Sequence, residues 1–214
     1  MHINRVLQLL LFTIFVVIHG TVAAQSLDEV FKAVHENDRK TVAQLLERGL
    51  DANSTDRQGN TLLMVAARLG YRDLVELLIQ HKAALDRRSP YGDTALMAAS
   101  LKGHLDIVKL LVEHGAQVNR SGWTPLGYAA FGGNASVVRY LLAKGADKDA
   151  VQPNGDTPLM LAVRNGNAAA ARELLYANAE LEHAGPDGDT ALSLAKKRGD
   201  QALIDLLKRA GATR

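Results

Sequence analysis

Residues 94–115 read TALMAASLKGHLDIVKLLVEHG, and they carry the local signals from which the architecture is predicted. It begins with a threonine whose hydroxyl can cap the first amides of a short helix. Gly103 is expected to end that helix, because the following turn requires a positive φ that glycine adopts at low cost. A second run with apolar residues at helical spacing follows and closes at Gly115. The stretch therefore predicts two short helices joined by a tight turn.

The same unit recurs along the chain. Its threonine-headed group begins at positions 61, 94, 124, 157 and 190, so the intervals are 33, 30, 33 and 33 residues. A glycine follows each group six residues later, and further glycines at positions 49, 115, 145 and 211 close the units. Counting back by 33 places Asn37 and Gly49 in a divergent first unit. Self-similarity at this period predicts a solenoid, in which each unit buries its apolar face against its neighbours.

These units resemble the ankyrin repeat, and the resemblance covers nearly all of the chain after residue 25. It implies an all-α repeat solenoid, an ankyrin-type stack of about six helix-turn-helix units with short hairpin finger loops. The expected organisation is a signal peptide at 1–24 and an ankyrin repeat domain at 25–214, with units at 26–55, 56–88, 89–118, 119–151, 152–184 and 185–214.

Two departures from the repeat are informative. Lys82 and Asn178 stand where closing glycines belong. Asparagine tolerates a left-handed backbone, whereas lysine there is expected either to cost about 1 kcal/mol or to shift the turn, with local fraying. The segment from Gly115 to Gly122 spans seven residues, whereas the equivalent segments that begin at Lys82 and Gly145 span ten. One finger has therefore lost three residues, which predicts a notch in the row of finger tips between the third and fourth units.

Composition excludes several classes of function. The 214 residues include no cysteine, which removes thiolate metal sites, cysteine nucleophiles and disulfides. Twenty-five basic and 23 acidic residues give a net charge of +2, too small to attract nucleic acid. We expect no nucleic-acid partner, no cofactor and a monomeric chain.

The N-terminus has the pattern of a secretory signal peptide. Arg5 precedes an almost wholly apolar run at 6–18, and the small residues of 22–24 precede Gln25. The run is shorter than the ~20 residues that cross a bilayer, so we expect cleavage after Ala24, export to the periplasm and no membrane span in the mature chain. Retention of the segment as an uncleaved anchor is the alternative.

Candidate catalytic groups have simpler explanations. His81 and His114 are one repeat apart, so repetition accounts for both, and His104 is expected to begin an outer helix. Asp93, Asp156 and Asp189 each precede a capping threonine, and we interpret them as solvated loop residues rather than as a paired acid and base. No nucleophile elbow, phosphate-binding loop or zinc-protease motif occurs, so the prediction is a protein without enzymatic activity.

The resemblance implies that the concave side, formed by finger tips and exposed inner-helix positions, binds a partner protein. Tyr91, Leu101, Trp123 and Phe131 are expected to cluster around the notch as the centre of that site. The further predicted contacts are Arg57, Arg68, Leu69, Asp93, Lys102, Asp156 and Arg164. Trp123 packing over the shortened finger is the alternative for that residue. Tyr128 has an inward phase and is predicted to be core.

The resulting hypothesis is a noncatalytic exported scaffold that binds a periplasmic protein. Exported ankyrin proteins similar to this one support oxidative-stress enzymes such as catalase or act as toxin-immunity proteins, and the resemblance admits both. One alternative is an envelope-binding module that contacts peptidoglycan or lipid headgroups through Arg164, Lys197 and Arg198. The other is a hydrolase within the loops.

Overall fold

The protein is a single-file stack of helical hairpins. The computed structural model describes residues 27–213; the predicted signal peptide and its cleavage point lie outside them. Residues 27–35 are helical, and the helices that follow are α2 (Arg39–Glu47), α3 (Leu62–Leu69), α4 (Arg72–Gln80), α5 (Ala95–Lys102), α6 (Leu105–Glu113), α7 (Pro125–Phe131), α8 (Ala135–Ala143), α9 (Pro158–Arg164), α10 (Ala168–Tyr176), α11 (Ala191–Arg198) and α12 (Gln201–Arg209).

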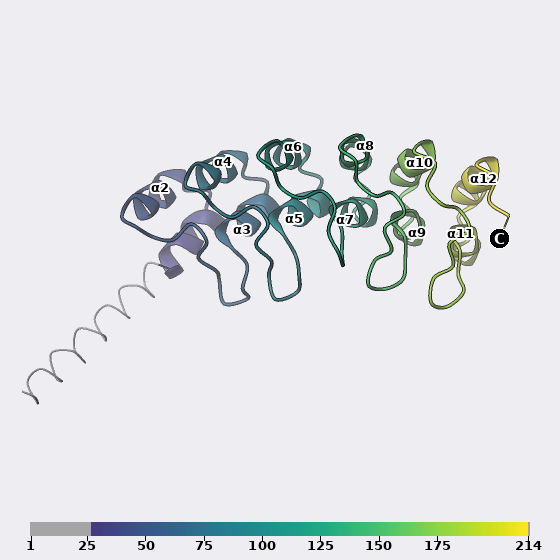
Figure 1. Cartoon of the computed structure of the whole chain (residues 1–214), viewed down its shortest axis with the longest axis horizontal. Coiled ribbons are helices and arrows are strands. Elements are labelled where there is room, and N and C mark those ends of the chain that lie inside the picture. The colour runs from purple at the N-terminus through teal and green to yellow at the C-terminus, as the bar shows by residue number, and fades with distance from the viewer. Residues whose placement is uncertain (1–26, 214) are drawn as a thin grey trace, which may run out of the picture.

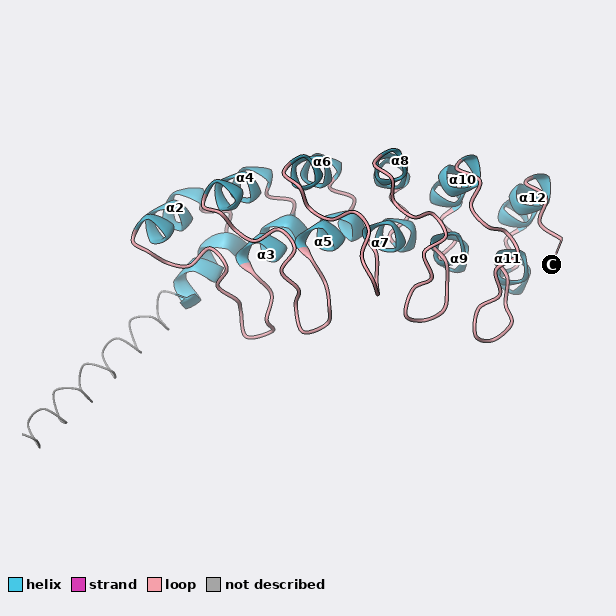
Figure 2. Ribbon diagram, in the orientation of Figure 1, coloured by secondary structure: helices cyan, strands magenta, loops and turns pink. Residues whose placement is uncertain are grey.

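The helices form two layers. An inner row contains α3, α5, α7, α9 and α11, and an outer row contains α2 and the even-numbered helices that follow it (Figure 1). Finger loops, pink in Figure 2, project from the inner row. No strand forms within residues 27–213, where an isolated bridge joins Thr55 and Thr61. The predicted all-α solenoid is therefore confirmed.

Threonine caps begin the inner helices as the repeat predicts. The side-chain oxygen of Thr94 accepts a hydrogen bond from the backbone N–H of Met97 at 3.3 Å, and Thr61 and Thr157 accept equivalent bonds from Met64 and Met160. Each bond satisfies an amide that the helix leaves unpaired, which stabilises the start by roughly 1 kcal/mol. The caps therefore fix where each inner helix begins.

The turns keep their left-handed geometry even without glycine. Asn37, Lys82 and Asn178 have φ values of 56°, 61° and 56°. The amides of Lys82 and Ala83 donate to the carbonyls of Ile79 and Leu78, both at 2.9 Å, in the pattern that the closing glycines show. Of the two expectations for Lys82, the turn therefore keeps its geometry at a conformational cost of roughly 1 kcal/mol, and the expected shift or fraying is not found.

Polar side chains join each unit to the next. The Asn134 side-chain amide donates to the carbonyls of Ser100 and Leu101 at 2.8 and 2.9 Å, and so satisfies the end of the preceding inner helix. Asn167 donates in the same way to Ala130 and Phe131. A neighbouring unit therefore completes the hydrogen bonding that a short helix leaves open.

Ser100 is a point where this packing is imperfect. Its side chain is fully buried and its hydroxyl has no hydrogen-bond partner. The equivalent positions of the second, fourth and fifth units hold the buried apolar residues Ala67, Ala130 and Val163, and the last unit holds the exposed Lys196. Replacing Ser100 with alanine is expected to raise the free energy of unfolding by about 1 kcal/mol, because an unpaired buried hydroxyl is removed and alanine favours the helix. Urea denaturation checks this, and a lower midpoint would contradict it.

Candidate functional site

The side chains predicted to bind a partner lie mainly on one surface. We call this surface, formed by the finger loops and the exposed sides of the inner helices, the inner face. Leu69, Tyr91 and Phe131 are large apolar residues that it leaves 36%, 79% and 47% exposed. Leu101 in the third unit and Trp123 in the fourth belong to the same predicted surface, and both are half-buried. Exposed apolar residues gathered on one face are typical of a binding surface.

A pocket of about 150 Å3 opens on the inner face between α3, α5 and α7. The residues that line it are Asn60, Met64, Arg68, Asp93, Thr94, Met97, Ala98, Leu101 and Tyr128. Three of them, Arg68, Asp93 and Leu101, were predicted as contacts from the sequence. Met64 and Met97 were not, because their place in the helix indicates burial; their flexible thioethers form an adaptable apolar floor.

Tyr128 corrects the sequence interpretation. It was predicted to be core, but its side chain is half-buried and lines the pocket. Its hydroxyl donates a hydrogen bond to Oδ1 of Asp93, and its ring lies 5.7 Å from the ring of Trp123 at an interplanar angle of 39°. Trp123 therefore packs against the first helix of its own unit, and Tyr128 forms one wall of the site.

Tyr128 is expected to ionise at a higher pH than an exposed tyrosine. Burial raises the pKa of its hydroxyl, and the hydrogen bond to Asp93 raises that pKa further. An exposed tyrosine ionises near pH 10. In an alkaline titration followed by phenolate absorbance at 295 nm, the main rise is therefore expected near that pH, and a late step from Tyr128 is expected at higher pH. The folded state holds this proton more tightly, so its stability falls as pH rises above 10. Replacing Tyr128 with phenylalanine removes one phenol; an unchanged late step would contradict the assignment.

The shortened finger is tied to the unit before it. In Figure 1 the loop between α6 and α7 is narrower than its neighbours and reaches less far, which confirms the notch. Arg120 pairs with Asp86 at 3.0 Å, and Arg88 donates to the carbonyl of Ser121 at 3.2 Å. Both contacts join the shortened finger to the preceding finger, which lies between α4 and α5. They anchor the short loop to its neighbour.

The expectation of solvated carboxylates is wrong for Asp156. Its carboxylate is 1% exposed and accepts two hydrogen bonds from Arg164, both at 2.9 Å. Asp189 is likewise mostly buried and pairs with Lys197 at 2.7 Å. The hydrogen bond to Asp156 raises the pKa of Arg164, and the bond from Lys197 lowers the pKa of Asp189. A short helix brings residues eight apart together here, which the repeat pattern alone does not reveal.

The remaining predicted contacts are exposed. Arg57, Arg68 and Lys102 project into solvent, and Arg57 lies 3.8 Å from Asp28 with both side chains open to water. Within residues 27–213, no carboxylate approaches Arg68 or Lys102 within 4.0 Å. These cations are therefore available to a partner.

The histidines make structural contacts. Nε2 of His104 lies 3.2 Å from the carbonyl of Arg68, where it plays the part that Asn134 plays one unit later. Nδ1 of His114 lies 2.8 Å from the carbonyl of Leu110, and Nε2 of His183 lies 3.1 Å from that of Gly155. Within the described part of the chain, no three histidine or carboxylate side chains are grouped to hold a metal, and no helix has the length and apolarity to cross a membrane.

Comparisons with known proteins agree with this geometry. The family model for ankyrin repeats (3 copies) matches residues 30–121, 85–152 and 117–184. Serine/threonine-protein kinase 12 of Arabidopsis thaliana is 40% identical over 55 residues, which are 26% of this chain and 12% of the kinase. The crystal structure of the human ASB11 ankyrin repeat domain matches with a TM-score of 0.80 and 24% identity, over 86% of this chain and 84% of that one. The last likeness concerns the fold alone.

Proposed function

This chain belongs to the ankyrin repeat family, and from that premise we propose that it is an exported, noncatalytic scaffold that binds one partner protein through the inner face around Tyr91, Leu101, Trp123 and Phe131. Ankyrin repeats indicate a protein-interaction scaffold. The observation that carries the choice of surface is the joint presence there of exposed apolar side chains and the pocket. Aromatic residues beside charged ones are typical of binding hot spots.

Export is supported by the sequence of residues 1–24. A charged start, an apolar run and small residues before Gln25 are the features that signal peptidase recognises. In the periplasm, the partner is either an enzyme whose stability the scaffold supports, such as a catalase, or a toxin that it neutralises. N-terminal sequencing of the chain secreted from a Gram-negative host is expected to begin at Gln25; a start at Met1 would contradict export by cleavage.

The envelope-binding alternative has weaker support. It relies on three cations of the C-terminal units, but Arg164 and Lys197 are paired with carboxylates, and Arg198 lies 4.0 Å from the carboxylate of Asp200. Their charges are largely neutralised within the chain. Binding through such contacts would also weaken steeply with added salt, whereas an apolar hot spot would hold.

Affinity capture from periplasmic extract tests the proposed surface. Replacing both Tyr91 and Phe131 with alanine is expected to lower recovery of the partner by tenfold or more, since two centrally placed aromatic side chains contribute about 1 kcal/mol or more each. Tyr176 is the matched control, because it is a tyrosine of similar exposure (75%, against 79% for Tyr91) on the outer helix α10. Equal recovery with all variants would refute the inner face as the binding surface.

A further inference from the structure

Two positions in each unit lie close together on the inner face and differ in charge from unit to unit. One precedes the capping threonine, and the other lies eight residues later at the end of the inner helix; we call them the rim pair. From the second unit to the sixth, the rim pairs are Asn60 and Arg68, Asp93 and Leu101, Trp123 and Phe131, Asp156 and Arg164, and Asp189 and Lys197. The same backbone geometry thus carries five different combinations of side chains.

In the last two units the two side chains of the rim pair form an ion pair with each other, and we call such a rim pair closed. Arg164 makes two hydrogen bonds to Asp156, and Lys197 contacts both oxygens of Asp189 at 2.7 and 2.8 Å. Each positive side chain is matched by a carboxylate of its own unit. The inner face of these units therefore offers a partner no unpaired charge at the rim.

In the second and third units the two side chains of the rim pair do not form an ion pair with each other, and we call such a rim pair split. Arg68 faces a position occupied by Asn60, whose side-chain amide donates to Asp56 instead. Asp93 has Leu101 in place of a cation and accepts the hydroxyl of Tyr128 from the next unit. The carboxylate is thus satisfied by a neutral donor, while the guanidinium of Arg68 has no carboxylate within 4.0 Å among the described residues.

The pocket lies between these split pairs. Arg68 stands at its rim, Met64, Met97 and Leu101 supply apolar lining, and Tyr128 forms a wall. A volume of about 150 Å3 suits a side chain the size of leucine or a phenyl ring, as apolar cavities of roughly that volume take up benzene. Lys102, which follows Leu101, is a further exposed cation, whereas Arg57 lines a separate pocket beside Asp28.

We propose that this pocket binds an acidic segment of the partner protein, in which an apolar side chain enters between Met64, Met97 and Leu101 while an adjacent carboxylate pairs with Arg68. The inference rests on the proposed function and specifies the chemistry of the partner. Asp93 keeps its charge, but one of its oxygens accepts the Tyr128 hydroxyl, and Arg68 repels a cation at the rim, so a basic segment is disfavoured.

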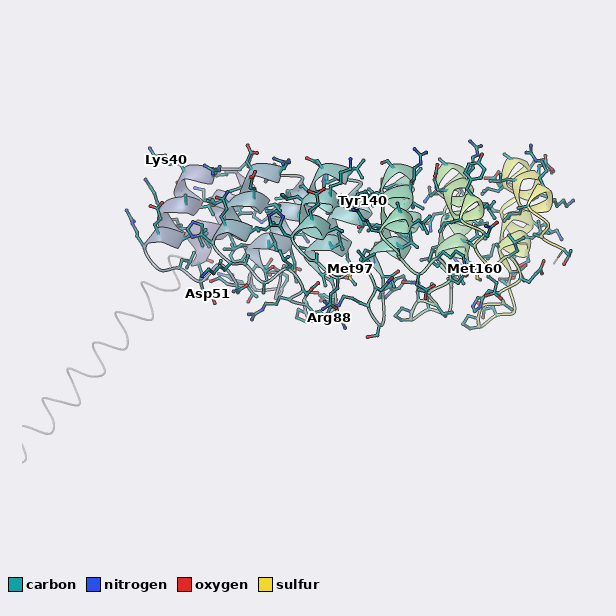
Figure 3. All side chains as sticks on the ribbon, turned by 45° about the horizontal axis from the view of Figure 1, so that its top comes forward. Lys40, Asp51, Arg88, Met97, Tyr140 and Met160 are labelled. Atoms are coloured by element: carbon teal, nitrogen blue, oxygen red, sulfur yellow. The ribbon has the colours of Figure 1, made fainter. Side chains whose placement is uncertain are left out.

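Methionine methyl NMR provides a direct test on the full chain. Met64, Met97 and Met160 are all buried, but Met64 and Met97 line the pocket, whereas Met160 lies in the fifth unit, well along the array from Met97 in Figure 3, and acts as an internal control. The probes are three capped peptides with a central leucine flanked by two glutamates, two glutamines or two lysines. The glutamate peptide is expected to shift the Met64 and Met97 signals and to leave Met160 in place.

Variants separate the charge from the apolar contact. The glutamate peptide is expected to bind about fivefold more tightly than the glutamine peptide, as suits one partly exposed ion pair, and Arg68→Gln should abolish that preference. Leu101→Ser should weaken both peptides, and Arg172→Gln on the outer row should change neither. Equal binding of the lysine peptide, or no shift of Met64 and Met97 at the highest soluble concentration, would overturn the inference.

The outcome is distinguishable from failure of the proposed function. If capture of the partner depends on Tyr91 and Phe131 but the peptides show no charge preference, the scaffold function stands and the acidic-segment inference falls. If capture is unaffected by every inner-face variant, the proposed function itself falls.

Discussion

Replacing Gly103 with alanine is expected to lower the free energy of unfolding by about 3 kcal/mol. Gly103 has a φ of 78°, where a Cβ costs roughly 1–2 kcal/mol. An added Cβ would also lie 2.4 Å from Oδ1 of Asn134, which must then move. Movement breaks the two hydrogen bonds that Asn134 donates to Ser100 and Leu101, at about 1 kcal/mol each. Urea denaturation followed by circular dichroism measures the loss.

Gly199 is the matched control for this change. It occupies the same turn in the last unit with a φ of 71°, but nothing lies within 4 Å of an added Cβ. Gly199→Ala should therefore cost only the conformational part, about 1 kcal/mol. Asn134→Ala should cost about 2 kcal/mol, and the double variant with Gly103→Ala should cost less than the sum. Equal costs at Gly103 and Gly199 would show that the next unit does not constrain the turn.

The fold was predictable from the sequence because the signals that specify it are local. Each unit repeats a threonine cap, a left-handed turn and an apolar outer helix, and all three are local requirements that a residue pattern records directly. Asn37 and Asn178 were placed correctly in left-handed turns by counting along the repeat. The shortened finger followed from length alone.

Contacts between units were less predictable, because different residue types fill one structural role. His104 and Asn134 occupy the same position of the repeat, and the side chain of each contacts a backbone carbonyl of the preceding unit. The sequence does not reveal this shared role, because the two residue types are chemically different. Gln152 is another example: from the fifth unit it accepts a hydrogen bond from the amide of Thr124 at 2.9 Å, in space that Gly127 leaves empty. Such compensation is visible only when neighbouring units are placed side by side.

The site was predicted in part. Its apolar residues were identified by transferring exposed positions from unit to unit, and Tyr91 and Phe131 are indeed exposed. Tyr128 was misplaced because its helical phase points inward, yet its side chain is only half-buried and lines the pocket. Asp156 was misplaced because its burial depends on Arg164, eight residues away. Comparing the two rim positions across units would have signalled both the closed and the split pairs.

Replacing Arg164 with alanine is the second large effect expected, a loss of about 2 kcal/mol in the free energy of unfolding. The change leaves the carboxylate of Asp156 buried at 1% exposure without its cation, and breaking a buried pair costs several kcal/mol. The Arg164 side chain is itself 44% exposed, so solvent screening reduces the figure. Replacing Asp156 with asparagine in the Arg164→Ala background should recover more than half of the loss, because the buried charge is then gone.

Arg68 occupies the same rim position three units earlier and should behave in the opposite way. No described carboxylate depends on it, so Arg68→Ala is expected to change the urea midpoint by less than the equivalent of about 0.5 kcal/mol. Its effect should appear instead in partner capture and in the preference for acidic peptides, and Arg164→Ala should leave that peptide preference unchanged once folding is confirmed. If Arg68→Ala destabilised the chain as much as Arg164→Ala, the guanidinium would be structural and the split rim pair would carry no information about the partner. One arginine therefore tests stability and the other tests recognition, at equivalent positions of one repeated backbone.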